Sequence, residues 1–330
     1  MEGPTPVSAL IHAATLVTAG VFLIIRCSPL FEFSEVTLFF ILLCGGLTSF
    51  FAATIAITQN DIKKVIAYST CSQLGYMVFI CGLSYYQLSM FHLVNHAFFK
   101  ALLFLGAGSI IHSISGEQDL RKYGNLVNFI PYTYSSMFVG FIALSGLPFL
   151  SGFYSKDLIL EIAFSKYTIG SLFVYWLGTL SAGLTAFYSF RVFYLTFWGK
   201  TLSFKYYLQK SHELPKNMGF SLLILVSGSI FSGYFLKDSF VGLGSTFWGN
   251  SIFVLSNHNL HLDYEFIPLF YKNLPLALSV CFSLLALCLN GFFFSLLPRK
   301  VTLGISSRKE FYNNKILHSL VKIFWFLNNK

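Results

Sequence analysis

Three side chains that can exchange a proton near neutral pH occur at helical spacing within one apolar stretch. His92, His96 and Lys100 stand at positions i, i+4 and i+8, so all three project from nearly one face of a helix. Either ring nitrogen of histidine can take up or release the proton, and desolvation makes a buried lysine easier to deprotonate. Groups one helical turn apart leave gaps that single water molecules can bridge. The spacing therefore indicates a proton relay.

Two other interpretations of His92 and His96 stay open from the residues alone. Histidines at i and i+4 can bind zinc, but no glutamate follows in an HExxH pattern, and Lys100 on the same face is a poor companion for a cation. The histidines could also be hydrogen-bonded packing residues between membrane helices. A charged lysine at a helix centre costs about 2.5–3.5 kcal/mol in hydrocarbon, so ionisable residues at this depth are functional by default.

Ionisable residues also occur in the first and third apolar segments. His12 lies well inside the first, where a lone histidine is as compatible with packing as with a relay. Lys63 and Lys64 open the third, directly after Asp61 and Ile62. We expect one lysine of this pair to be an interfacial anchor whose aliphatic stem lies along apolar surface.

One apolar segment, residues 128–162, is too long for a simple crossing. A Gly-Leu-Pro sequence at 146–148 and Gly152 interrupt it, and Lys156 and Asp157 follow. Proline removes a helical hydrogen bond, and non-helical backbone survives at membrane depth only where protein or a water-filled cavity surrounds it. A broken helix followed by a Lys-Asp pair is typical of transport sites. The alternative is a helix that ends at the first glycine, with Lys156 in an interfacial segment outside the lipid.

Two acidic residues accompany Lys156. Asp157 could form an ion pair whose strength tunes the lysine, and Glu161, a turn further on, could join it or lie in the head-group layer.

The composition indicates that these residues belong to membrane helices. Of the 330 residues, 55% are hydrophobic and only 11% are charged, whereas a soluble domain carries about a quarter charged residues. At roughly 20 apolar residues per crossing, the length allows about eight helices. The ten-residue alternating segments of a transmembrane barrel are absent. We therefore expect an all-α polytopic bundle of about eight transmembrane helices, one of them broken at 128–162.

The apolar segments and the connections between them divide the chain. Eight segments are long enough to span a bilayer: Pro6–Ile25, Glu35–Thr58, Lys63–Leu83, Gln87–Ser113, Asn128–Ile162, Thr168–Trp198, Asn217–Leu236 and Leu274–Leu297. The net charge of +9 lies mainly in the connections, as in loops that set topology and contact anionic lipid, and no nucleic-acid-binding pattern accompanies it. Near the end, Lys315–Leu327 has the apolar spacing of a helix along the membrane surface.

With these residues described, the sequence resembles the antiporter-like chain 5 family of NADH:ubiquinone oxidoreductase, respiratory complex I, in its mitochondrial plant and algal form. Four stretches carry the resemblance: MEGPTPVSALIHAAT at 1–15, DIKKVIAYST at 61–70, the helix from His92 to Lys100, and GFYSKD at 152–157. The resemblance runs over nearly the whole chain and is weakest after about Leu202.

The resemblance implies a proton-translocating subunit of the mitochondrial inner membrane, within an enzyme that couples electron transfer from NADH to ubiquinone to proton pumping. It places His12, Lys63, His92, His96 and Lys100 in the central relay and makes Lys156, with Asp157 beside it, the exit-side lysine. NADH and ubiquinone belong to the whole complex. This chain is expected to bind no cofactor, because it has neither a Gly-rich nucleotide loop nor a cysteine ligand set.

The resemblance also implies partners and a division of the chain. Residues 1–200 match the C-terminal half of the antiporter-like core, 201–297 add further helices and loops, and 298–330 form a basic amphipathic segment leading into a lateral helix. The family's earlier half, its lateral helix and its final crossing find no match, which suggests a fragment or one product of a split gene. Expected partners are the missing half, the neighbouring antiporter-like subunit, other membrane-arm subunits and lipid.

Two further functions stay open. One is a cation/proton antiporter subunit of the same superfamily, although Na⁺ exchange would favour intramembrane carboxylates, and the apolar segments hold few. The other is a structural membrane scaffold in which the ionisable residues only pack.

Overall fold

The chain is all-helical where a computed structural model describes it, at residues 3–199, 213–242, 247–249, 251–255, 258 and 263–296. The first part contains α1 (Thr5–Val7), η1 (Ser8–Thr15), α2 (Leu16–Arg26), α3 (Ser28–Phe31), α4 (Glu35–Thr58), α5 (Ile62–Gly82) and α6 (Tyr86–Ser113). The second contains η2 (Leu120–Lys122), η3 (Leu126–Asn128), α7 (Pro131–Ser145), α8 (Ser151–Ser165), α9 (Ile169–Phe193), η4 (Tyr194–Trp198), α11 (Lys216–Phe240), η6 (Asp263–Phe266) and α12 (Leu269–Leu296). The expected surface helix Lys315–Leu327 lies outside the described residues.

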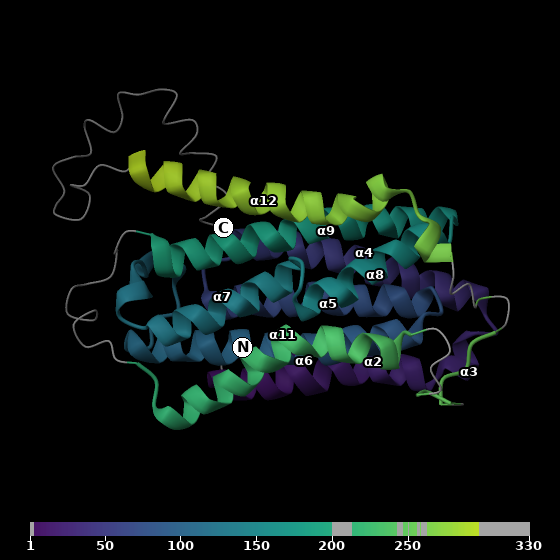
Figure 1. The fold of residues 1–330 in the computed structure, drawn as a ribbon, viewed down its shortest axis with the longest axis horizontal. Coiled ribbons are helices and arrows are strands. Elements are labelled where there is room, and N and C mark those ends of the chain that lie inside the picture. The colour runs from purple at the N-terminus through teal and green to yellow at the C-terminus, as the bar shows by residue number, and fades with distance from the viewer. Residues whose placement is uncertain are drawn as a thin grey trace.

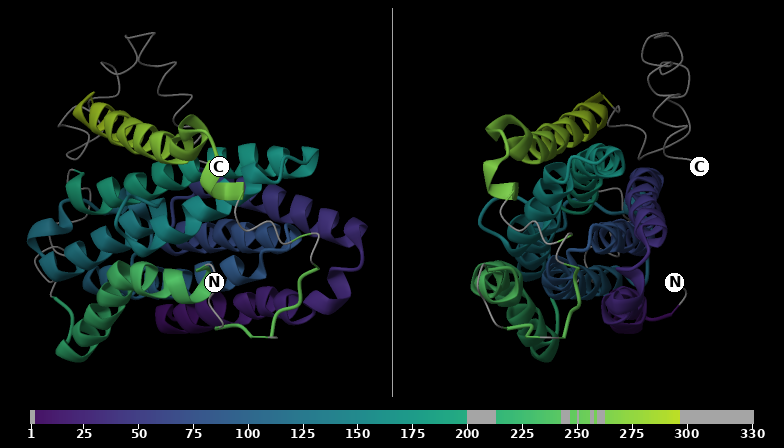
Figure 2. Two further views of the ribbon diagram at one scale, coloured as in Figure 1. Left: turned by 45° about the vertical axis from the view of Figure 1, so that its right-hand side comes forward. Right: turned by 90° about the vertical axis from the view of Figure 1, so that its right-hand side faces the viewer.

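The long helices form a bundle whose dimensions fit a bilayer. In the described residues, seven helical stretches are long and apolar enough to cross a membrane, and α7 and α8 follow one another along the bundle as the broken eighth (Figure 1). In the end-on view of Figure 2, the blue helices α5 and α6 lie at the centre, with α2 and α4 on one side and α11 on the other. The prediction of a polytopic helical bundle is confirmed.

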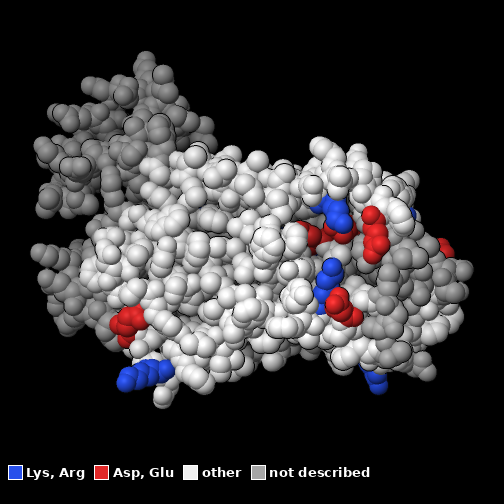
Figure 3. Space-filling view, viewed as in Figure 1, with Lys and Arg blue, Asp and Glu red and all other residues white. Residues whose placement is uncertain are grey.

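The surface of the bundle suits lipid. Large apolar side chains on α2 and α4 point outward, among them Phe22, Phe40 and Phe51, with exposed fractions of 54%, 62% and 67%. On the face shown in Figure 3, acidic and basic side chains gather near the two ends of the long helices, and the surface between them carries no charge. An uncharged band between charged rims is the pattern expected of helices that span a membrane.

Small residues bring α4 and α5 into backbone contact. A Cβ atom at Gly75 of α5 would lie 2.6 Å from the backbone nitrogen of Ser49 in α4, and one at Gly45 of α4 would lie 2.3 Å from the backbone nitrogen of Phe79. Ser72 donates a hydrogen bond to the Ser49 carbonyl at 2.9 Å. In lipid, helix association depends on such close packing because the hydrophobic effect does not separate helix from acyl chain. The glycines therefore fix the position of α5.

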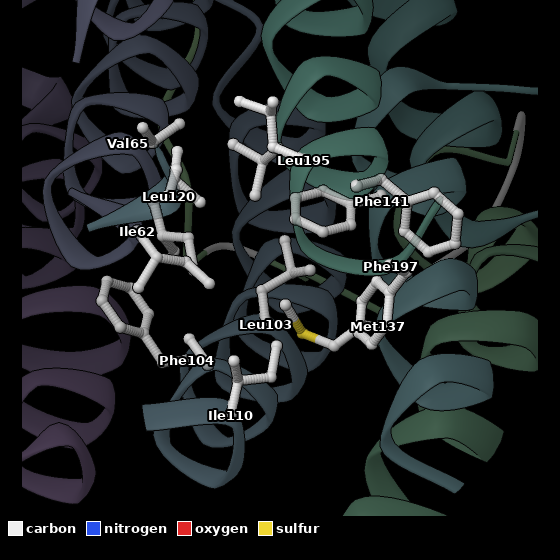
Figure 4. Packing of buried hydrophobic residues seen from close by; sticks show 14 of the residues in the cluster. Ile62, Val65, Leu103, Phe104, Ile110, Leu120, Met137, Phe141, Leu195 and Phe197 are labelled. Carbon is white, nitrogen blue, oxygen red and sulfur yellow. The ribbon is translucent and has the colours of Figure 1, made fainter. Parts of the chain in front are cut away.

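Apolar packing fixes the other side of the central helices. Leu103 of α6, Met137 and Phe141 of α7 and Phe197 of η4 point toward one another in Figure 4 and are at most 3% exposed. The same figure shows Ile62 and Val65 of α5 with Leu120 and Phe104, also nearly inaccessible.

A buried arginine ties α9 to the end of α4. Arg191 donates to the carbonyls of Ile57 and Gln59, both at 2.7 Å, and to the side-chain oxygen of Asn60 at 2.9 Å. The final carbonyls of a helix have no partner within it, and a guanidinium also interacts favourably with the helix C-terminus. This contact orients α9 relative to the α4–α5 pair.

The break between α7 and α8 is built from the glycines that the sequence indicated. Gly146 adopts the left-handed conformation, with φ 79°, that ends many helices. A Cβ atom at Gly152 would lie 1.8 Å from the Ala143 carbonyl oxygen, so only glycine fits where α8 begins. Lys156 follows on α8 and is 2% exposed. It therefore lies inside the bundle and not on its surface.

At one end of the bundle, a buried carboxylate joins three connections. Glu32, which follows α3, accepts from the Tyr86 hydroxyl at 2.9 Å and from the Leu255 backbone at 3.3 Å, and His258 Nδ1 lies 2.8 Å from it. Burial raises the pKa of Glu32, but its hydrogen bonds, the largest from His258, hold this pKa below the ordinary value of 4.5. The carboxylate thus fastens the connection between α11 and α12 onto the bundle.

We expect Gly75→Ala to destabilise the bundle, because its methyl group would collide with the α4 backbone. Overpacking of this kind costs about 1–3 kcal/mol. Thermal unfolding of the detergent-solubilised chain measures the effect. Gly20→Ala is the matched control, since a Cβ atom at Gly20 meets nothing within 4 Å. Equal unfolding temperatures for the two variants would contradict the role given to the α4–α5 contact.

We expect stability to fall in acid through Glu32. Because its folded pKa lies below the unfolded one, its contribution is fully present above the unfolded value and is lost as pH falls through the folded value. Glu32→Gln should cost about 1–3 kcal/mol at neutral pH and remove this part of the acid sensitivity in a pH series of thermal unfolding. Glu35→Gln, at an exposed position, is the control. An unchanged acid profile in the Glu32 variant would refute the assignment.

Candidate functional site

Helix α6 carries the His-Lys face into the centre of the bundle. His92, Asn95, His96 and Lys100 each have no exposed surface. The helix begins after Ser84, whose positive φ of 67° turns the chain back from α5. Of the 28 residues of α6, 19 are buried, so neighbouring helices surround it almost completely. The sequence therefore places these side chains against protein and not against lipid.

Lys100 meets a hydroxyl of α5. Its amine donates a hydrogen bond to Ser69 Oγ. Ser69 in turn donates to the carbonyl of Ile66 at 2.7 Å, which leaves a lone pair free for the lysine. The partner of this amine is thus a neutral group, which can hold the lysine in either protonation state.

His92 connects three helices. Its Nδ1 lies 2.8 Å from Ser155 Oγ of α8, and its Nε2 lies 3.1 Å from Gln73 Oε1 of α5. In this orientation of the amide, Nε2 carries the proton and donates it to Gln73, and Nδ1 accepts from the serine hydroxyl. Nδ1 is therefore the nitrogen at which the ring could take up a second proton, and it faces the helix that carries Lys156.

His96 lies between His92 and Lys100 along α6. Its ring centroid is 6.3 Å from that of His92. Its ring packs against that of Phe99 in an edge-to-face arrangement, with the two centroids 5.4 Å apart. Within the described part of the chain, neither ring nitrogen has a hydrogen-bond partner. Gln73 Nε2 and Asn95 Nδ2 share this property. Buried polar groups of this kind are normally satisfied by ordered water, so the region around His96 suits hydration.

Lys156 is held by α9 and α5. Its amine donates to Thr185 Oγ1 at 2.9 Å and lies 5.5 Å from the centre of the Tyr76 ring. Thr185 donates to the Ala182 carbonyl at 2.7 Å, so it accepts from the lysine. The Tyr76 hydroxyl is bonded to Gly178 and Ser181 of α9. As at Lys100, the direct partners are uncharged.

The other predicted residues do not join this group directly. Lys63 is buried and donates to the Gly3 carbonyl at 3.2 Å, whereas Lys64 is exposed and pairs with Asp61 at 3.0 Å. The structure thus assigns the surface position of the pair to Lys64. His12 lies in the backbone of η1, and its side chain lies outside the described part.

The expected ion pair between Lys156 and Asp157 does not form among the described residues. Neighbours in a helix point in directions about 100° apart, so the carboxylate and the amine do not come into direct contact, although they still interact electrostatically. Glu161 instead pairs with Lys272 of α12, at 3.7 Å and near the surface. Sequence reasoning missed Lys272, because more than a hundred residues separate it from its partner.

Sequence reasoning also missed the uncharged partners of the two buried lysines and His92, which are Ser69, Gln73, Tyr76, Ser155 and Thr185. Each lies on the face of its helix that is turned toward the buried lysines and histidines. Serine and threonine are common in membrane helices, where they bond to carbonyls three or four residues back. Nothing in their local sequence distinguishes them. No group of three metal-ligating side chains occurs in the described residues.

Comparison with known proteins agrees with this arrangement. The model of the family described as NADH:quinone oxidoreductase/Mrp antiporter, transmembrane region, matches residues 1–185. The NADH-ubiquinone oxidoreductase chain 5 of Marchantia polymorpha is 56% identical over 88% of this chain and 44% of its own length. That of Phytophthora infestans is 51% identical over the whole chain and 48% of its own length.

The chain thus spans about half the length of the curated relatives it matches. A chain in the structure of the Mrp complex from Dietzia sp. DQ12-45-1b shares the fold, with a TM-score of 0.70 at 22% identity over 98% of this chain and 34% of that one. The family match covers more than half of the 330 residues, including the whole His-Lys face of α6. The chain therefore belongs to the NADH:quinone oxidoreductase/Mrp antiporter transmembrane family.

Proposed function

We propose that this chain is a proton-translocating part of the membrane arm of NADH:ubiquinone oxidoreductase, in the mitochondrial inner membrane. The observation that carries the proposal is the buried polar line from Lys100 through His96 and His92 to Lys156, supported by hydroxyls on three other helices. The names of the relatives at 51–56% identity support the same activity. In this proposal NADH and ubiquinone react elsewhere in the complex, and this chain holds no redox group.

The geometry suits transfer of one proton between the two lysines. Lys100 releases a proton toward the region of His96, which accepts it at one ring nitrogen and gives up the proton of the other. His92 passes it on through Nδ1, which faces Ser155 and the start of α8. Lys156 takes it up, so that one ammonium is lost and one is formed. Two ammonium groups in one poorly hydrated interior repel each other, so charge on one lysine favours its loss from the other.

The proposed partners follow from the surface and the length of the chain. The relatives are about twice as long, and we propose that the remaining part of such a protein and other membrane-arm subunits cover the sides of α2 and α4. Lipid would contact the rest of the apolar band. Lys63, His12 and the Lys156–Asp157 end would extend the route toward these neighbours.

We expect Lys100→Met in the assembled complex to lower the number of protons pumped per electron while the complex still forms. Methionine fills the same space without an exchangeable proton, so the relay loses its central member. The measurement combines proton uptake by membrane vesicles with NADH oxidation and with the amount of assembled complex. Lys64→Met is the matched control, because this lysine is exposed and forms an ion pair with Asp61 at the surface.

Each alternative function gives a different result. If the chain were only a scaffold, Lys100→Met would reduce assembly and leave protons per electron unchanged. If it were a cation/proton antiporter working without redox partners, proton movement would follow a Na⁺ gradient in the absence of NADH, and Lys100→Met would remove that activity. Either outcome would overturn the proposal.

A further inference from the structure

Helix α9 presents a second line of hydroxyl groups beside the histidines. Ser181, Thr185 and Tyr188 stand at i, i+4 and i+7, which is one face of a helix. All three are at most 1% exposed. Thr185 accepts from Lys156, and Ser181 bonds to Tyr76, over whose ring the Lys156 amine lies. This face of α9 is therefore turned toward the same interior as the His-Lys face of α6.

Tyr188 is the member of this face that the relay described above does not use. Its hydroxyl is buried and makes no hydrogen bond of standard geometry within the described part of the chain; a polar neighbour there is the side chain of Ser69. It approaches Ser69, the residue that accepts the hydrogen bond of Lys100. One turn away along α9 lies Thr185, which holds Lys156. Tyr188 thus has the partner of Lys100 as a neighbour on α5 and the partner of Lys156 one helical turn away on α9.

We propose that Tyr188, with Ser69 and Thr185, forms a second branch of the proton path between Lys100 and Lys156, parallel to the branch through His96 and His92. This inference rests on the proposed function. A phenylalanine would fill the same apolar surroundings without a buried hydroxyl in need of a partner. A buried hydroxyl that makes no hydrogen bond of standard geometry to protein is instead suited to bind the ordered water that a proton path requires.

The transfer through this branch conserves every hydroxyl. Lys100 gives one proton to the neighbouring oxygen, and that group passes its own proton to the next. The Tyr188 hydroxyl receives a proton from the side of Ser69 and releases its original one toward Thr185. Lys156 gains a proton on Nζ. At the end, one ammonium has been neutralised and one has formed, and Ser69, Tyr188 and Thr185 are unchanged apart from the direction of their O–H bonds.

The test compares Tyr188→Phe, His96→Phe and the double variant in the assembled complex. The quantity measured is the part of pumping that Lys100→Met abolishes, expressed as protons per electron. With two parallel branches, each single variant loses only part of this quantity and the double variant loses all of it. The solvent deuterium isotope effect on pumping should also differ between the two single variants, because each forces protons through a different set of groups.

Tyr175→Phe is the matched control. It removes a hydroxyl from the same helix, and among the described residues that hydroxyl donates to the Tyr271 carbonyl at 2.9 Å and to neither serine nor threonine of the proposed branch. The proposal fails if Tyr188→Phe pumps like Tyr175→Phe. It also fails if His96→Phe alone abolishes the Lys100-dependent part. If Lys100→Met leaves pumping intact, the proposed function itself fails, which is a distinguishable result.

A second pair of variants decides the matter if Tyr188→Phe does not assemble. Thr185→Val has nearly the same shape but no hydroxyl, and Thr185→Ser keeps the hydroxyl. Combined with His96→Phe, the serine variant should retain pumping and the valine variant should lose it. Equal pumping by both would overturn the second branch.

Discussion

The arrangement depends on the need to bury two lysine amines inside a lipid-embedded protein without fixing their charge. A charged lysine facing acyl chains is costly, and a carboxylate partner would hold the ammonium in its charged form. Here Lys100 and Lys156 meet Ser69 and Thr185, which are neutral and can hydrogen-bond the amine whether or not it carries the extra proton. The acidic side chain nearest in sequence, Asp157, does not pair with Lys156. The neutral partners can therefore stabilise either lysine in its charged form without preventing the loss of its proton.

Helix α5 makes two kinds of contact: its small residues pack against α4, and its polar residues contact the buried lysines and His92. Gly75 meets the backbone of α4, which sets the depth and rotation of the helix. The opposite positions supply Ser69, Gln73 and Tyr76 to the lysines and to His92. Arg191 adds a third fixed point by capping α4 from α9. A shift of either helix would separate hydroxyl from amine, so the contacts that hold the bundle together also fix the geometry of the proposed relay.

Much of this was predictable from sequence, for physical reasons. Hydropathy located the spans to within a few residues, because helix ends coincide with turns such as that at Ser84. Helical periodicity placed His92, His96 and Lys100 on one face. Periodicity could not show which of Lys63 and Lys64 is buried. It also could not identify Thr185 as a partner of Lys156 or the pairing of Glu161 with Lys272, because these contacts join helices that are distant in sequence. The relay roles of all seven predicted residues stay predictions: His12, Lys63, His92, His96, Lys100, Lys156 and Asp157.

The shortness of α8 has a consequence for how the protein responds to its lipid. At 15 residues the helix is about 22 Å long, less than the roughly 30 Å of a hydrocarbon core, and 12 of its residues are buried against other helices. Thinning or thickening of the bilayer changes the tilt of helices with a wide outward apolar face, such as α12. Lys156 is carried by a helix that touches little lipid. Its depth is consequently set by the protein interior, and transfer at this lysine should be indifferent to acyl-chain length.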